Sequence, residues 1–165
     1  MTAGYAATVT ATNSPDVVTV ERLIASPPEP IFELLAHAER HRDIDGSGSV
    51  RDARKTNGER LALGSRFGMS MKIGVPYSMV STVVEFEEGR RIAWQTRGPG
   101  PLGKFVAGRI WRYELEPAEG GTLVRESWDI TQESPVSKLA VRRMAEMTRK
   151  NMAATLERIE QLVTA

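Results

Sequence analysis

The sequence predicts an α+β domain in which a curved antiparallel sheet holds a long C-terminal helix, and two patterns indicate this. About six strand-like segments joined by short turns follow one another between residues 49 and 131, and such neighbours pair antiparallel. From Ser134 the apolar period changes to that of a helix, which begins with Pro135 and runs without proline or glycine to about Val163. Only this helix is long enough to cover the apolar face of the sheet.

Composition narrows the possible functions. The chain has 165 residues, which indicates one domain (17–165) after a loose tail (1–16). It has no cysteine, so thiolate metal sites and cysteine nucleophiles are excluded, and a reducing cytoplasm is expected. Because 22 basic residues balance 21 acidic ones, no broad field attracts nucleic acid. No apolar run approaches the roughly 20 residues that span a bilayer. We therefore expect a cytoplasmic monomer or homodimer without membrane insertion.

The remaining elements follow from local signals. A first strand covers residues 17–25, Ser26 is expected to cap a short helix with Pro28 in its first turn, and that helix ends near His37. A second short helix or turn covers residues 38–42, and a Gly-Ser-Gly loop follows Asp45. The later strands are predicted over residues 49–55, 66–73, 77–86, 90–97, 108–116 and 122–131.

The C-terminal helix has an impure apolar face. On a helical wheel one broad face carries Ala140, Met144, Met147, Met152, Ile159 and Leu162, with Thr148, Asn151 and Thr155 near its middle. A buried amide such as that of Asn151 destabilises the fold unless it is hydrogen-bonded. Its partner is either backbone or water within a packed core, or a ligand in a hollow. The flexible methionines suit both a core and an adaptable binding surface.

A carboxylate falls on an apolar strand face near the end of the sheet. Strand alternation places Glu126 between Val124 and Trp128, opposite a face with Trp111 and Tyr113. If this face points inward, burial raises the pKa of Glu126 and suits it to general acid or base chemistry. The alternative is a salt bridge to Arg22, Arg109 or Arg112, or a face turned to solvent.

Other candidate motifs are weaker. His41 and Asp45 are spaced i, i+4 and form either an oriented general base or a tie at the end of a loop. His37 precedes His41 by one turn, but two histidines without further ligands do not make a metal site, and none is assigned. Residues 98–103 match GxGxxG, yet prolines remove amide donors and a strand follows, so no dinucleotide or other cofactor is expected.

Four segments together resemble a known superfamily: VER–ASPP–IF (20–32), VEF–RIAW (84–94), WRYELEP (111–117) and GGTLV (120–124). In order and spacing they are similar to the START-like, Bet v 1-related (SRPBCC) superfamily, and specifically to the bacterial polyketide cyclase/dehydrase and lipid-transport group. RHRDIDGSG (40–48) resembles the loop after the short helices of bacterial members. The resemblance implies a helix-grip fold with seven strands and an apolar tunnel rimmed by residues 45–48 and 98–103.

The resemblance does not imply one chemistry. The leading hypothesis is a binding or carrier module for a lipid, polyketide or aromatic metabolite. The alternatives are a cyclase or dehydratase in which Glu126, or His41 with Asp45, moves protons, and an interaction module like the chaperone cofactors of similar fold. The residues expected to contact the ligand are Phe67, Met69, Met71, Tyr77, Trp94, Trp111, Tyr113, Trp128, Met144, Met147, Thr148, Asn151 and Thr155.

Overall fold

The computed structural model describes residues 8–10, 14–54, 58–73, 75–98 and 108–165, of which residues 8–10, 51–54, 71, 73 and 75–77 are described by their backbone alone. The described strands form one antiparallel sheet in the order β1-β2-β8-β7-β6-β5-β4-β3. The strands are β1 (Thr8–Thr10), β2 (Val17–Ile24), β3 (Val50–Arg54), β4 (Arg66–Ile73), β5 (Val75–Glu87), β6 (Arg91–Arg97), β7 (Arg109–Ala118) and β8 (Gly121–Asp129).

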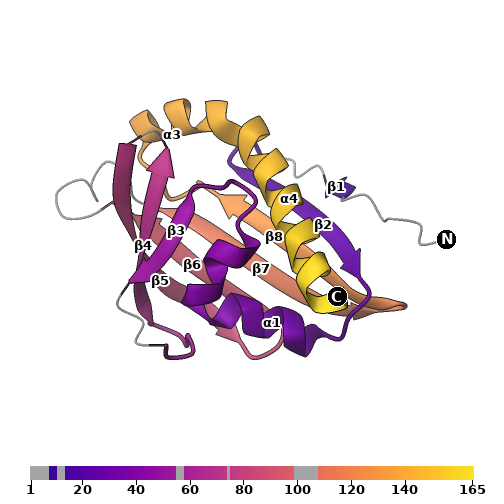
Figure 1. The fold of residues 1–165 in the computed structure, drawn as a ribbon. Coiled ribbons are helices and arrows are strands. Elements are labelled where there is room, and N and C mark those ends of the chain that lie inside the picture. Colours follow the sequence, from indigo (N-terminus) through magenta and orange to yellow (C-terminus); the bar gives the residue numbers. More distant parts are fainter. Residues whose placement is uncertain (1–7, 11–13, 55–57, 74, 99–107) are drawn as a thin grey trace.

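The predicted α+β architecture is confirmed: α4 (Ala145–Thr164) crosses the concave side of this sheet (Figure 1). The sheet has eight strands where seven were expected. The additional one is β1, in which Val9 lies opposite Val20 of β2 although the segment was placed in a loose tail. A three-residue strand is too short to show a periodic pattern, which is why the sequence did not reveal it.

The short helices after β2 are α1 (Pro28–Ala36), η1 (Ala38–Arg40) and α2 (His41–Ile44). Pro28 occupies the first helical position, as expected. The predicted cap is wrong, because Pro27 is the N-cap residue and the hydroxyl of Ser26 donates to the Pro27 carbonyl at 3.0 Å. These helices lie beside one end of α4 and close that side of the sheet (Figure 1).

The predicted C-terminal helix is broken into α3 (Pro135–Val141), the 3₁₀ turn η3 (Arg142–Met144) and α4. Ser134 caps α3 as expected, accepting from the backbone N–H of Ser137 at 3.3 Å. A 3₁₀ turn advances about 120° per residue instead of about 100°, so it shifts the wheel on either side of it. The buried side chains of α4 are Thr148, Met152, Thr155, Leu156 and Ile159.

Three predicted members of the apolar stripe are exposed: Ala140 in α3, and Met147 and Leu162 in α4. Met147 lies about 100° from Thr148 around α4, and half of its side chain (50%) is accessible. Leu162 is also exposed near the C-terminus of the helix. None of the described helices combines the length and the apolar character that crossing a bilayer requires.

Candidate functional site

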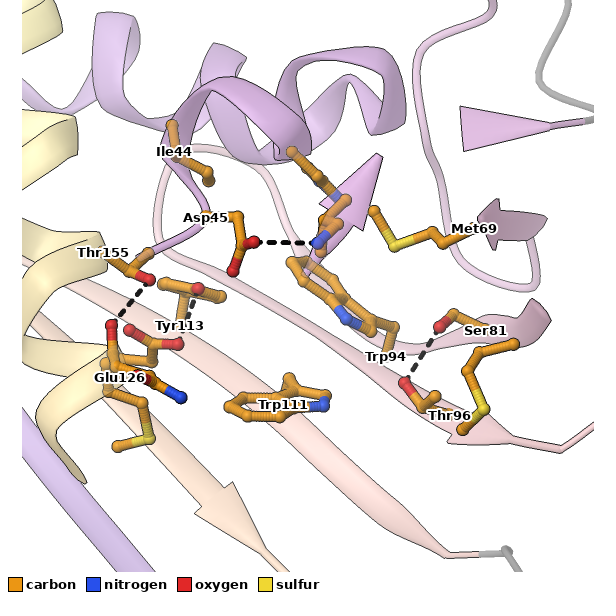
Figure 2. A pocket seen from close by; sticks show the side chains of 15 residues that line it. Ile44, Asp45, Met69, Ser81, Trp94, Thr96, Trp111, Tyr113, Glu126 and Thr155 are labelled. Atoms are coloured by element: carbon orange, nitrogen blue, oxygen red, sulfur yellow. Dashed lines mark hydrogen bonds between the residues drawn. The ribbon is translucent and has the colours of Figure 1, made fainter. Parts of the chain in front are cut away.

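A cavity of about 140 Å³ lies between the concave face of the sheet, α2 and α4 (Figure 2). Its wall is mostly apolar and aromatic, with a few polar groups. The described lining residues are His41, Ile44, Asp45, Val50, Met69, Met79, Ser81, Trp94, Thr96, Trp111, Tyr113, Glu126, Asn151, Met152 and Thr155.

Glu126 is the most deeply buried acid in this wall, with 2% of its surface exposed. It lies on β8 directly opposite Tyr113 of β7, and in such cross-strand pairs the side chains meet on one face. The hydroxyl of Tyr113 donates to Oε1 of Glu126 at 2.7 Å (Figure 2). The second oxygen, Oε2, is buried without a hydrogen-bond partner among the described residues.

The alternative of a salt bridge at Glu126 is wrong. Each of the three candidate arginines pairs with another carboxylate, and these pairs are Arg22–Glu160, Arg109–Glu133 and Arg112–Glu85. The carboxyl group thus has an inward-facing, apolar environment without a compensating cation among the described residues.

This environment determines the protonation of Glu126. Burial raises its pKa to about 8, the negative charge of Asp45 acts in the same direction, and the hydrogen bond from Tyr113 partly offsets both. Burial also raises the pKa of Tyr113, so its hydroxyl keeps its proton. At neutral pH Glu126 is mostly a neutral carboxylic acid. Because Oε1 accepts from Tyr113, the acid proton belongs on Oε2.

His41, at the start of α2, is buried at the other side of the cavity wall (4% exposed). Its Nε2 lies 2.8 Å from the carbonyl oxygen of Leu35. A carbonyl only accepts, so Nε2 carries the hydrogen and Nδ1 is the bare nitrogen. The ring stacks on Trp94 at 4.6 Å between centroids and meets Phe67 edge-on at 5.4 Å. Burial lowers the pKa of His41 to about 4, so the ring is neutral.

The predicted pairing of His41 with Asp45 is wrong. The carboxylate of Asp45 accepts from the backbone N–H of Ser47 at 3.0 Å, the Ser47 hydroxyl at 2.6 Å and the backbone N–H of Val50 at 2.9 Å. Asp45 therefore ties down the loop after α2, the alternative role that the spacing allowed. His37 lies apart, beside Glu33 and Glu39, and no cluster of metal-binding side chains occurs among the described residues.

Thr155 joins this loop to α4. Its hydroxyl donates to the carbonyl of Asn151 at 3.0 Å and accepts from the backbone N–H of Gly46 at 2.9 Å. The backbone of Gly46 comes so close that a Cβ would lie 2.4 Å from the Asn151 carbonyl oxygen. Among the polar residues of the apolar helix face, Thr155 thus holds the loop beside the cavity, and Asn151 lines the cavity itself.

The structure brings six of the 13 predicted contact residues together in the cavity wall. Met69, Trp94, Trp111 and Tyr113 line the cavity with Asn151 and Thr155. The side chains of Met71 and Tyr77, like residues 99–103 of the predicted rim, lie outside the described part. The others are not among the described lining residues, because they pack elsewhere in the core or, for Met147, face solvent: Phe67, Trp128, Met144, Met147 and Thr148.

Several lining residues were missed by the sequence reasoning. Ser81 and Thr96 face each other on β5 and β6 and share a hydrogen bond of 2.9 Å (Figure 2). Thr96 is two residues from Trp94, so strand alternation could have placed it on the same face as Trp94. The remaining ones are Ile44, Val50, Met79 and Met152.

Replacing Tyr113 by Phe is expected to destabilise the fold by about 1–3 kcal/mol, because it leaves Oε1 of Glu126 buried and unpaired. The pKa of Glu126 should rise further, since the hydrogen bond from Tyr113 lowers it. Urea denaturation at pH 7 measures the loss. In a Glu126→Leu background the Tyr113 hydroxyl has already lost this acceptor, so the same change should be neutral or stabilising. Equal losses in both backgrounds would contradict the role of this bond.

Similar proteins share this architecture. A protein of Mycobacterium smegmatis, Ms6760, superimposes with a TM-score of 0.70 at 17% identity, covering 96% of this chain and 98% of that one. A solution structure of a protein from Arthrobacter aurescens gives 0.71 at 13% identity, covering 95% and 91%. At these identities the likeness shows the fold alone.

The sequence comparisons go further. The uncharacterized protein Rv0088 of Mycobacterium tuberculosis is 34% identical over 108 residues, which are 64% of this chain and 44% of that protein. This chain thus spans less than half the length of that relative. Residues 15–164 match the family model described as "Polyketide cyclase / dehydrase and lipid transport". With the fold, the inward-facing cavity and this match over nearly the whole chain, the protein belongs to the polyketide cyclase/dehydrase and lipid-transport family.

Proposed function

We propose that the protein binds an uncharged, largely apolar small molecule, of the lipid, polyketide or aromatic-metabolite kind, in the cavity between the sheet and α4. The observation that carries the proposal is the buried carboxyl of Glu126, whose Oε2 has no partner among the described residues in a wall of aromatic rings. Ligand sites are typically apolar hollows with a few well-placed polar groups. No lysine or arginine is among the described lining residues, so nothing there matches an anionic ligand.

The volume of the cavity limits what enters without movement. An apolar cavity of roughly 150 Å³ holds a benzene molecule, so about 140 Å³ accommodates the ring of a single-ring compound. A longer lipid or a multi-ring polyketide requires the closing loop to move away from α4. Single-ring compounds are therefore the right first probes.

Binding is tested by titrating acetophenone into the protein at pH 7, followed by calorimetry and by the fluorescence of Trp94 and Trp111, which line the cavity. Val50→Phe fills the cavity from the loop side and is expected to weaken binding at least 10-fold. The same substitution at Val84, which is exposed and is not among the described lining residues, should leave binding unchanged. Unaltered affinity in Val50→Phe would place the ligand elsewhere.

A second candidate function is proton-transfer catalysis, as in a cyclase or dehydratase. It is favoured by one observation, the burial of Glu126 in the cavity wall. This burial raises the pKa of Glu126 to about 8, so the carboxyl can both give and take a proton near neutral pH. Asp45 is occupied by the loop backbone, so Glu126 is the stronger candidate for the proton shuttle.

Glu126→Gln separates the two functions, because the amide keeps the shape and a donor but cannot shuttle a proton. The probe is an enolisable aromatic β-diketone, and the turnover measured is its enolisation. Loss of this turnover in the variant with retained binding supports catalysis. Turnover equal to that of the wild type would remove Glu126 from the chemistry and leave a binding protein.

A further inference from the structure

A second polar atom in the cavity wall is as unusual as Oε2 of Glu126. Nδ1 of His41 is also buried without a hydrogen-bond partner among the described residues. Both residues line the same cavity. Buried polar atoms in folded proteins are hydrogen-bonded in the large majority of cases, so two exceptions in one cavity require an explanation.

The two atoms have opposite hydrogen-bonding characters. Nδ1 of His41 is an acceptor, because Nε2 uses the ring hydrogen on the carbonyl of Leu35. The carboxyl of Glu126 in its acid form is a donor through Oε2, because Oε1 already accepts from Tyr113. The two buried, unpaired atoms of the wall therefore offer one donor and one acceptor to a molecule in the cavity.

Aromatic rings separate these two groups along the wall. The ring centroids of His41 and Trp94 are 4.6 Å apart, and those of Trp94 and Tyr113 are 5.5 Å apart. Tyr113 in turn donates its hydroxyl hydrogen to Glu126. A ligand that satisfies both ends must thus carry its two polar groups on different sides of a flat, apolar body. Rings in the wall favour an aromatic body, since stacked and edge-on contacts add to its burial.

We infer that the ligand is a neutral hydroxyaryl carbonyl compound, whose carbonyl oxygen accepts from Glu126 and whose hydroxyl donates to Nδ1 of His41. The inference rests on the proposed binding function and narrows it, since a simple hydrocarbon or acyl chain lacks the second polar group. It also assigns His41 a role in specificity rather than in proton transfer. Its neutral ring serves as a fixed acceptor.

The test uses four near-isosteric probes: 4-hydroxyacetophenone, acetophenone, 4-ethylphenol and ethylbenzene. In the wild-type protein 4-hydroxyacetophenone should bind most tightly, and removal of either polar group should weaken binding about 10-fold, the effect of one hydrogen bond to a buried group. Calorimetry at pH 6.5, where Glu126 holds its proton, gives the four dissociation constants.

Two variants assign each effect to its residue. In His41→Phe the hydroxyl should no longer matter, so that 4-hydroxyacetophenone and acetophenone bind equally, while the carbonyl effect persists. In Glu126→Leu the carbonyl effect should vanish and the hydroxyl effect persist. If His41→Phe fails to fold, the ¹⁵N shift of Nδ1 in the wild type decides, since it moves only when this nitrogen accepts a hydrogen bond from the ligand.

The outcomes separate the two proposals. Equal binding of all four probes would overturn the donor–acceptor assignment, as expected if water satisfies both atoms, and would leave the apolar binding function standing. A hydroxyl effect that survives in His41→Phe would also overturn it. Failure of every probe to bind at millimolar concentration would overturn the binding function and this inference together.

Discussion

Replacing Glu126 by Gln is expected to make the protein progressively more stable than the wild type as the pH rises. Burial raises the pKa of Glu126 to about 8 from its ordinary value of 4.5. Between these values the folded protein holds a proton that the unfolded chain has released, so its contribution to stability is complete below about pH 4.5 and is lost as the pH rises through 8. The wild type should lose about 3–4 kcal/mol relative to the variant between pH 5 and pH 8.

The comparison with the variant is needed because the titration of His41 changes the stability of the folded protein with pH in the opposite direction. Burial lowers its pKa to about 4 from 6.5, so its contribution is complete above pH 6.5 and is lost as the pH falls through 4. From pH 4.5 to 6.5 the stability of the wild type falls with pH because of Glu126 and rises with pH because of His41. Above pH 6.5 only the pH dependence due to Glu126 remains.

Urea denaturation of both proteins at pH 5, 6, 7 and 8 measures the effect. Gln reproduces the neutral acid, with one oxygen to accept from Tyr113 and an amide that donates into the cavity. As a control, Glu116→Gln changes an exposed residue of β7 and should show a small difference at every pH. Parallel stability curves for the wild type and Glu126→Gln would mean that Glu126 is ionised in the folded protein.

The sequence was sufficient to find Glu126 and insufficient to find its partner. Strand alternation has a period of two, so one buried neighbour such as Val124 or Trp128 fixes the side of the sheet on which Glu126 lies. The pairing with Tyr113 depends instead on the register of β7 and β8. That register follows from a turn of two residues, Glu119 and Gly120, where the pattern suggested five. A shift of one residue would turn every side chain to the other face.

The same contrast holds for the helices. The cap at Ser134 and the position of Pro28 could be predicted because each is a local signal in the sequence. The 3₁₀ turn at Arg142–Met144 has no such signal, and it separates Ala140 and Met144 from the helical wheel of α4. Met147 was misjudged because the predicted face was drawn too broad, since it lies about 140° from the buried Met152 around the same helix. The orientation of His41 depends on the carbonyl of Leu35, a contact that exists only once α1 and α2 have folded. Local signals were thus mostly reliable, with the cap predicted at Ser26 as the exception, whereas tertiary contacts were not predictable.

Gly46→Ala is expected to destabilise the protein by at least about 3 kcal/mol and to weaken ligand binding. A Cβ at this position would lie 2.4 Å from the carbonyl oxygen of Asn151 and 2.5 Å from the backbone nitrogen of Thr155. Both are backbone atoms of α4, which cannot move aside as a flexible side chain can, so the cost reaches the upper end of that for overpacking. The loop must lift away, and the hydrogen bond from Gly46 to Thr155 is lost with it.

Gly48→Ala, two residues away, is the matched control. Gly48 has a φ of +70° and nothing within 4 Å of its would-be Cβ, so only the backbone preference opposes alanine, at about 1 kcal/mol. Because Asp45 and Val50 of the same loop line the cavity, lifting the loop at Gly46 opens the binding site, whereas the Gly48 variant should keep it. Denaturation and acetophenone titration of both variants measure the two effects. If the two variants lost the same stability and affinity, the packing of Gly46 on α4 would not be what closes the cavity.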